Sequence, residues 1–425
     1  MRYRLIVMRM SLAVFVGGAA AQESPPLTRM MELNRAGRWE QAAEEAQRFL
    51  DAGSERSNEG RCEAYYHLAY ARTHLGLAGQ AGASLAAYES KCQGIASGHW
   101  LRREVARLRE ELGPGKAPPA DDGFWRAGAP AALGMNVAAL ESHRRLCEGT
   151  GADACLVVRR GEIVQEFYSA RYRAPAYAMS STKSITGLLV GMLIDDGKIK
   201  SADEPVCTYI REWCEGRRGK VTIRHLLTMT SGLPRMYEEG VASTNDKNRY
   251  VIGLTPSREP GSAWAYSNEG AQLLSPIMDE AAGEPIQDYA RRRLFAPLGM
   301  VDTRLHLDEK GHAWTYADME TTPRDLARVG LLMLNKGVWQ GQRVVSAAWV
   351  EQSTRRSQEF EPRYGLLWWL YDGPKGYAAL GYLDTNLYVF PGQELVVVRM
   401  QSKPSARQAP YEPEALRLFG RMIRR

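Results

Sequence analysis

Strand-forming runs occur at two distant places in this sequence, and helical patterns fill the chain between them. The early runs are Ala154–Arg159 and Glu162–Tyr168, which the turn at Arg160-Gly161 joins as a hairpin. The late runs are Leu366–Tyr371, Gly376–Leu380, Leu387–Phe390 and Leu395–Met400. This order predicts an α+β fold: an antiparallel sheet joined from both ends of its domain and flanked by helices, together with an inserted all-helical part.

A helical region precedes this part of the chain, and a linker separates the two. Residues 27–113 are rich in Ala, Leu, Glu and Arg, whereas Gly113–Pro119 is a linker by composition. Segments around Gly37 and Ala64 resemble two imperfect tetratricopeptide repeats, and a generic helical hairpin fits them nearly as well. We expect a signal peptide at 1–21, a small repeat-like helical domain at 22–113, a linker at 114–122 and the sheet-containing domain at 123–425.

The first 21 residues have the pattern of a secretory signal peptide. Arginines at positions 2, 4 and 9 accompany an apolar run from Ser11 to Val16, and Ala19-Ala20-Ala21 provides a cleavage site before Gln22. The apolar run is far shorter than the roughly 20 residues that a membrane span needs. The sequence therefore predicts a periplasmic or secreted protein with no membrane span.

Net charge excludes one class of partner. The chain has 55 basic and 49 acidic residues, and cleavage of the signal removes three arginines and no acid, which lowers the net charge from +6 to +3. This weak and scattered balance gives no electrostatic basis for binding nucleic acid.

Six cysteines behind a signal peptide indicate disulfides. If Gly76–Gly79 is the turn of a helical pair, Cys62 and Cys92 lie at equal distances from it and at the same height on facing helices, which predicts a bond between them. The local pairs Cys147–Cys155 and Cys207–Cys214 are the expected remaining bonds. None of the six has the spacing of a zinc site.

Ser180-Ser181-Thr182-Lys183 is the most informative tetrapeptide. It opens a helix whose next eleven residues, Ser184–Ile194, carry no charge, and a helix that is apolar all round is buried. Ser180 and Lys183 share a face, and burial should lower the pKa of the lysine enough for it to act as a base toward the hydroxyl. A serine N-cap with a solvent-reaching lysine explains this segment equally well.

Tyr266-Ser267-Asn268 lies just before another apolar helical pattern. In extended chain, positions two apart point the same way, so Tyr266 and Asn268 could face one cleft, where the phenol could shuttle the serine proton. Taken separately, Asn268 as a helix cap and Tyr266 as a core aromatic are the simpler interpretations.

Together these motifs resemble the serine β-lactamase-related hydrolases, which include class C β-lactamases, D-alanyl-D-alanine carboxypeptidases, esterases and nylon-oligomer hydrolases. The intervening Val221–Leu233 and the later Arg293–Met300 and Thr322–Arg328 also look like this family, and the resemblance covers about residues 135–400. Tyr364–Trp369 favours the esterase and nylon-oligomer branch. The resemblance implies a β-lactamase-like fold.

The resemblance also implies acyl transfer without a cofactor or a metal. Ser180 would attack a carbonyl while Lys183 and Tyr266 handle its proton, and water would then hydrolyse the acyl-enzyme. Asn268 would bind the substrate amide or help to hold the lysine. The oxyanion hole would use the Ser180 N–H and a second one from a late strand.

One departure from the family pattern concerns its third motif, a strand with Lys-Thr-Gly or His-x-Gly. The best match is Ala379-Leu380-Gly381, in which Gly381 keeps the backbone accessible and the Tyr382 N–H is the candidate oxyanion donor. The missing cation disfavours substrates gripped by a carboxylate, and hence efficient β-lactamase activity. In relatives, the segment Pro234–Gly261 rims the cleft, which makes Tyr237 a weaker substrate-binding candidate.

The sequence therefore predicts an exported serine hydrolase that cleaves small amide, peptide or ester substrates through Ser180. A penicillin-recognising D-alanyl-D-alanine carboxypeptidase or β-lactamase is one alternative. Another alternative is a non-catalytic binding protein that uses the helical domain. Whichever function is correct, the helical domain is a candidate docking site for a protein partner.

Overall fold

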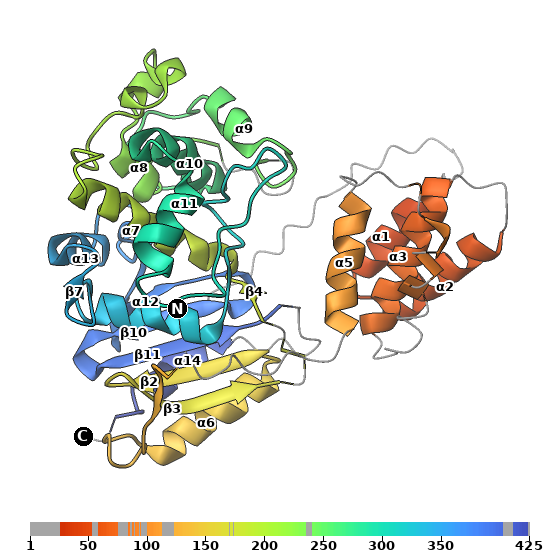
Figure 1. Ribbon diagram of the computed structural model, residues 1–425, viewed down its shortest axis with the longest axis horizontal. Coiled ribbons are helices and arrows are strands. Elements are labelled where there is room, and N and C mark those ends of the chain that lie inside the picture. Colours follow the sequence, from red (N-terminus) through yellow and green to blue (C-terminus); the bar gives the residue numbers. More distant parts are fainter. Residues whose placement is uncertain are drawn as a thin grey trace, which may run out of the picture. The chain divides into compact units, whose positions relative to one another are not determined.

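The chain folds into two compact units, Met1–Pro114 and Gly115–Arg425, and each is described by itself. The structure is a computed structural model (Figure 1). It describes residues 26–52, 58–74, 84–85, 87–88, 90–92, 94, 100–112, 123–169, 171–172, 174–234, 240–402 and 411–423. Within these residues, no helix combines the length and the apolar character needed to cross a membrane.

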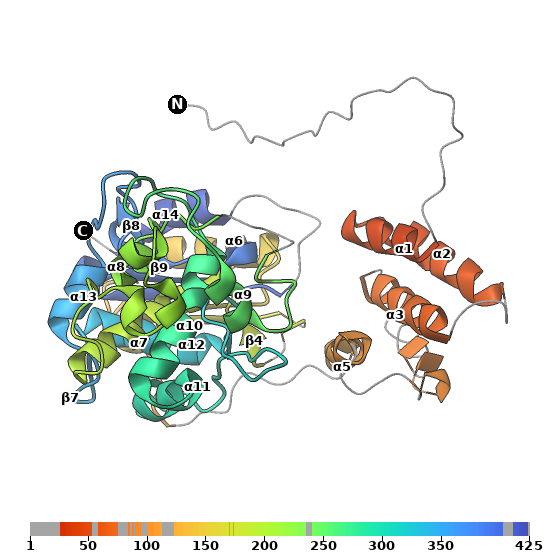
Figure 2. The ribbon, with the colours of Figure 1, turned by 90° about the horizontal axis from the view of Figure 1, so that it is seen from above.

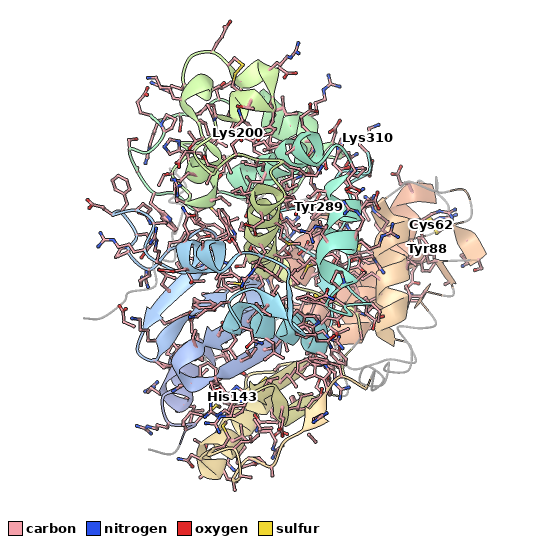
Figure 3. All side chains as sticks on the ribbon, turned by 60° about the vertical axis from the view of Figure 1, so that its left-hand side comes forward. Cys62, Tyr88, His143, Lys200, Tyr289 and Lys310 are labelled. Carbon is pink, nitrogen blue, oxygen red and sulfur yellow. A yellow bond between two sulfur atoms is a disulfide. The ribbon has the colours of Figure 1, made fainter. Side chains whose placement is uncertain are left out.

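The described part of the first unit is helical. Its helix α3 packs on both sides, with Leu68 in one apolar cluster and Cys62 in another that also contains Tyr88 (Figure 3). The predicted disulfide between Cys62 and Cys92 is confirmed, whereas the turn expected at Gly76–Gly79 lies outside the described residues. The resemblance to tetratricopeptide repeats stays a prediction. The helices of this unit are α1 (Pro26–Arg35), α2 (Trp39–Asp51), α3 (Asn58–His74) and α5 (Trp100–Leu112).

A seven-stranded sheet forms the base of the second unit, in the order β1-β3-β2-β11-β10-β9-β8. Early and late strands meet where β2 pairs with β11, so the prediction of a sheet joined from both ends is confirmed. Neighbouring strands are antiparallel except for β1 and β3, which are parallel. The strands are β1 (Arg126–Ala127), β2 (Ala154–Arg159), β3 (Glu162–Tyr168), β8 (Trp369–Asp372), β9 (Lys375–Ala379), β10 (Asn386–Phe390) and β11 (Leu395–Met400).

Both faces of this sheet are covered, which explains why β2 and β11 are apolar throughout rather than alternating. Leu156 and Val158 point into the main core, which includes α7 and α12. Cys155 and Val157 point the other way, into a second core closed by α6 and α14 (Figure 1).

The predicted all-helical part occupies the middle of the chain. Its helix α10 contacts α7, α8, α9 and α11 (Figure 2). The helices of the unit are α6 (Val137–Gly149), α7 (Thr182–Asp195), α8 (Ile223–Leu227), α9 (Lys247–Gly253), α10 (Asn268–Ala282), α11 (Ile286–Ala290), α12 (Pro323–Leu334), α13 (Ala347–Ser353) and α14 (Tyr411–Phe419). Two small ribbons pair β4 (Ala176–Tyr177) with β5 (Glu320–Thr321) and β6 (Val338–Trp339) with β7 (Gln342–Arg343).

One strand boundary differs from the sequence pattern. The pattern starts a strand at Leu366, whereas β8 begins at Trp369. Leu367 has φ +62°, and its amide donates to the Leu227 carbonyl oxygen rather than to a strand. The first residues of the apolar run therefore attach this segment to the end of α8, and the strand starts only after them.

The two local disulfides predicted for the second unit, Cys147–Cys155 and Cys207–Cys214, are also confirmed. The first joins the end of α6 to β2. Disulfides are characteristic of proteins that fold in oxidising compartments.

Candidate active site

Ser180 and Lys183 meet at the start of α7, the buried helix that the sequence predicts. Ser180 lies in the 3₁₀ turn Met179–Ser181, and α7 follows at once from Thr182. The Lys183 side chain is almost fully buried, and its Nζ donates to the Ser180 Oγ at 3.0 Å and to the Tyr316 carbonyl oxygen at 2.6 Å. A hydroxyl and a carbonyl thus fix the lysine, which places its nitrogen where it can take the serine proton.

Tyr266 lies beside this pair, two residues before the start of α10. The Lys183 Nζ is 4.8 Å from the centre of its ring. Two further phenols are close: burial raises the pKa of Tyr364, with a contribution from Tyr266, and burial raises that of Tyr316, with a contribution from Asp318. Both therefore keep their protons and are unsuitable as proton acceptors.

Two backbone amides point to an oxyanion hole. Within the described residues, the N–H groups of Ser180 and Tyr382 have no hydrogen-bond acceptor in the protein. Gly381 brings their two segments together, because a Cβ there would lie 2.8 Å from the Ala178 carbonyl oxygen and 2.6 Å from that of Thr385. Only glycine permits so close an approach, and the Gly381 N–H itself donates to the Asn386 Oδ1 at 3.0 Å.

Two further residues are predicted to bind the substrate, Asn268 and Tyr237. Asn268 is the first residue of α10, and within the described part of the chain its Oδ1 has no hydrogen-bond partner. The helix cap is Ser267, whose Oγ accepts from the Gly270 N–H, so Asn268 is free of the capping role considered above. Tyr237 lies outside the described residues.

Aromatic rings cluster around Tyr266. The ring of Trp369 stacks on that of Tyr266 at 6.3 Å with an interplanar angle of 23°, and Trp264 lies 6.2 Å from Trp369. Tyr364 meets Trp369 edge to face at 4.9 Å. These rings make the surroundings of the reacting groups apolar, which strengthens electrostatic interactions there.

Two groups of possible metal ligands occur among the described residues. In the first, His143 lies beside Cys147 and Cys155, whose sulfurs are bonded to each other. In the second, Asp308 accepts backbone N–H donors from Lys247 and His312, so this carboxylate already closes a loop. Neither group contacts Ser180.

Sequence reasoning did not find three residues that shape this site. Tyr316 acts through a backbone carbonyl, for which no sequence signal exists. Ser181 donates its buried hydroxyl to the carbonyl oxygens of Thr385 at 2.6 Å and Ala379 at 3.1 Å. Arg399 is the one charged residue in the apolar run of β11, and that contrast could have revealed it.

The family model described as Beta-lactamase matches residues 142–421. The 6-aminohexanoate-dimer hydrolase of Paenarthrobacter ureafaciens is 28% identical over 297 residues, which cover 60% of this chain and 74% of that protein. Esterase EstB of Burkholderia gladioli is 32% identical over 144 residues, 29% of this chain and only 36% of the esterase.

A solved structure agrees with the fold. The crystal structure of a penicillin-binding protein from Bacillus halodurans superposes with a TM-score of 0.51 and 17% identity, covering 62% of this chain and 96% of that one. At this identity the likeness concerns the fold alone.

Proposed function

The chain belongs to the Beta-lactamase family, and on that premise we propose that it is an exported serine hydrolase that cleaves small amide, peptide or ester substrates through an acyl-enzyme on Ser180. The observation that carries the proposal is the 3.0 Å hydrogen bond from the buried Lys183 Nζ to the Ser180 Oγ. Similarity to an amide hydrolase and to an esterase supports this range of substrates.

The proposed reaction begins when the Ser180 Oγ bonds to the substrate carbonyl carbon and its proton passes to the Lys183 Nζ. The N–H groups of Ser180 and Tyr382 donate to the oxyanion that forms. Tyr266 then relays the proton to the leaving amine or alkoxide, and water hydrolyses the acyl-enzyme while the same groups return the proton.

Asn268 is proposed to bind the substrate, since its Oδ1 has no protein partner among the described residues and can accept from an amide N–H. Ala379 stands where relatives of the penicillin-recognising type carry a cation, so the substrate need not carry a carboxylate. Export is supported by the signal pattern at 1–21 and by the disulfides of both units.

Acylation of Ser180 is the decisive test. Full-length protein is treated with a fluorophosphonate and its mass is measured, and we expect one adduct that is absent in Ser180→Ala and retained in Ser142→Ala, a partly buried serine on α6. Lys183→Met should lower kcat/KM for a nitrophenyl ester by about a hundredfold or more, because the proton acceptor is lost.

The substrate class follows from turnover by the same preparation. Nitrophenyl esters should be cleaved much faster than a chromogenic cephalosporin. Rapid cephalosporin turnover would instead support the penicillin-recognising alternative. Failure of wild-type protein to react with any acylating probe would refute the hydrolase and leave the binding protein.

A further inference from the structure

The turn that follows Tyr382 has an unusual backbone. Leu383 has φ +61° and Asp384 has φ +55°, so two consecutive residues with side chains adopt the left-handed conformation. Such residues are disfavoured unless their surroundings hold them in place. The same turn carries the Tyr382 N–H that the proposed reaction uses.

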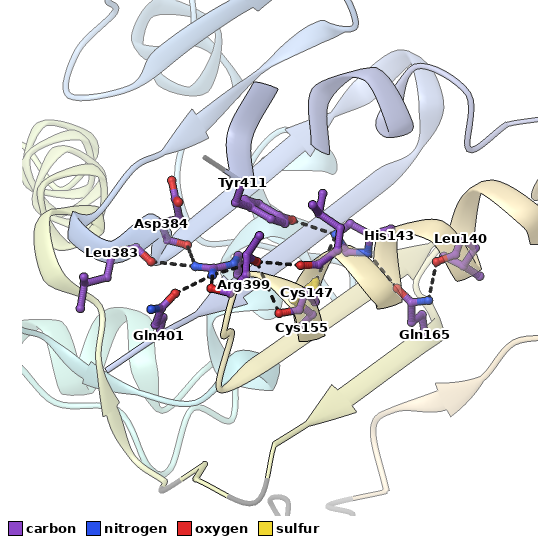
Figure 4. The surroundings of a disulfide bond; sticks show 12 residues. Leu140, His143, Cys147, Cys155, Gln165, Leu383, Asp384, Arg399, Gln401 and Tyr411 are labelled. Atoms are coloured by element: carbon purple, nitrogen blue, oxygen red, sulfur yellow. Dashed lines mark hydrogen bonds between the residues drawn. A yellow bond between two sulfur atoms is a disulfide. The ribbon is translucent and has the colours of Figure 1, made fainter. Parts of the chain in front are cut away.

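The guanidinium of Arg399 forms hydrogen bonds with this turn (Figure 4). Its Nη1 donates to the Leu383 carbonyl oxygen at 2.7 Å and to the Asp384 carbonyl oxygen at 3.1 Å. These are the carbonyls of the two left-handed residues, so one planar cation bridges the strained part of the turn.

Arg399 is itself fixed inside the protein. Arg399 is only 1% exposed. Its Nη2 donates to Thr150 and Gln401, and its guanidinium carbon lies 4.7 Å from the centre of the Tyr411 ring. Thr150 follows α6 three residues after Cys147, whose disulfide attaches that helix to β2. The arginine therefore cannot move away from the turn without disturbing several elements.

A second tether comes from the residue beside it. Asn386 and Arg399 are cross-strand partners in β10 and β11, so their side chains lie on the same face of the sheet. Asn386 accepts from the Gly381 N–H, while Arg399 donates to the carbonyls of the next two positions after Tyr382. The oxyanion donor is thus held on both sides along the chain.

The nucleophile connects to the same turn through Ser181. Its Oγ donates to the Thr385 carbonyl oxygen, at the end of the turn, and its own backbone directly follows Ser180. Ser181 therefore sets the spacing between the two proposed oxyanion amides.

We propose that Arg399 is a positioning residue for catalysis: by bridging the Leu383 and Asp384 carbonyls it aims the Tyr382 N–H at the oxyanion, with Ser181 fixing that amide relative to Ser180. The inference rests on the proposed acyl transfer. A misplaced donor loses transition-state stabilisation without losing substrate contacts, so kcat should fall and KM should not rise.

The test compares Arg399→Met with a matched control, Arg159→Met, in the full-length chain. Arg159 is also a buried arginine on a central strand, and it donates to the carbonyls of Leu133 and Gln393. It is the last residue of β2, whereas Arg399 pairs with Cys155 near the start of that strand. The readouts are kcat, KM and the inhibition constant of phenylboronic acid. Its boron accepts the Ser180 oxygen as the serine proton leaves, which gives a tetrahedral anion with no leaving group.

For Arg399→Met we expect kcat to fall about tenfold or more, with KM changed less than about threefold. Boronate affinity should fall by the same factor, about 1.4 kcal/mol for each tenfold. Arg159→Met should lower the denaturation midpoint comparably but leave kcat and boronate affinity within about twofold. Arg399→Lys, which keeps one charged donor, should recover part of the loss.

The proposal is overturned if Arg399→Met keeps wild-type kcat and boronate affinity, or if Arg159→Met loses as much of both. Should Arg399→Met fail to fold, Arg399→Lys and Ser181→Ala decide by the same two criteria, because each weakens one tether of the turn. Failure of the proposed acyl transfer has a different signature: the wild-type protein would then neither bind boronate nor react at Ser180.

Discussion

His143 is a buried titratable side chain in the second core, between α6 and α14. Its Nδ1 lies 2.8 Å from the Gln165 Oε1 and its Nε2 lies 2.8 Å from the Tyr411 hydroxyl (Figure 4). Burial lowers the pKa of His143 to about 4, and the charge of Arg399 acts in the same direction. The imidazole is therefore neutral in the folded protein at neutral pH.

This lowered pKa makes stability depend on pH. The unfolded chain binds the proton near pH 6.5 and the folded chain only near pH 4, so acidification through this window favours unfolding. The difference corresponds to about 3 kcal/mol, complete above pH 6.5 and lost by about pH 4. In His143→Gln the fall of the unfolding free energy between pH 7 and pH 4.5, measured by urea denaturation, should be smaller by most of this amount. An unchanged fall would contradict it.

Individual residues show where sequence reasoning succeeds. Ser180, Lys183 and Tyr266 could be selected because short spacing and a recognisable order mark them, and the structure brings them within reach of one another. Arg399 and Tyr316 reach the site through folding alone, from positions more than 130 residues after Lys183. Their contacts involve backbone carbonyls, whose positions no side-chain pattern encodes.

Helix α7 depends on two small residues for its packing. The Trp349 side chain from α13 lies against Gly187 and Gly191, and its Nε1 donates to the Gly187 carbonyl oxygen at 3.0 Å. The sequence predicts that this helix is buried on all sides, and that prediction is confirmed. It does not predict which distant side chain fills the space left by glycine.

Gly191→Ala tests this packing. The added Cβ would lie 2.1 Å from the Trp349 ring, so the indole must shift and its hydrogen bond to Gly187 must weaken. Overpacking of this kind costs about 1–3 kcal/mol, which a lower urea midpoint would show. Gly149→Ala is the control, since no atom lies within 4 Å of its added Cβ at the end of α6. Equal midpoints for the two variants would refute the packing argument.

The sequence predicts the strands that contain long apolar runs, but it does not predict the strands of only two residues. The boundaries of β2, β3 and β11 coincide with those predicted from the sequence. Strands such as β1 and β4 contain two residues each, too few to show any periodicity. Their pairing follows from neighbours elsewhere in the chain.

The molecule consists of two units with separate apolar cores, and the described site residues all belong to the second. The Cys62–Cys92 bond closes a loop with a sequence separation of 30 in the first unit. By the chain-entropy relation such a loop is worth about 3–4 kcal/mol, a large share for a small unit.

Replacing both of these cysteines by alanine should therefore destabilise the first unit alone. Calorimetry should show one unfolding transition moved to lower temperature and the other unchanged, and kcat for a nitrophenyl ester should stay within about twofold. Loss of activity, or a common shift of both transitions, would show that the units are energetically coupled.

The strand order also has a consequence for synthesis. The edge of β2 that faces β11 stays uncovered until β11 is made, and 234 positions separate Arg159 from Gln393, just before that strand. At about 5–20 residues per second, the ribosome needs roughly 10 to 50 seconds to bridge them. Throughout this interval the hairpin of β2 and β3 is available to chaperones but cannot complete its sheet. The sheet of the second unit therefore forms only after nearly the whole chain has been synthesised.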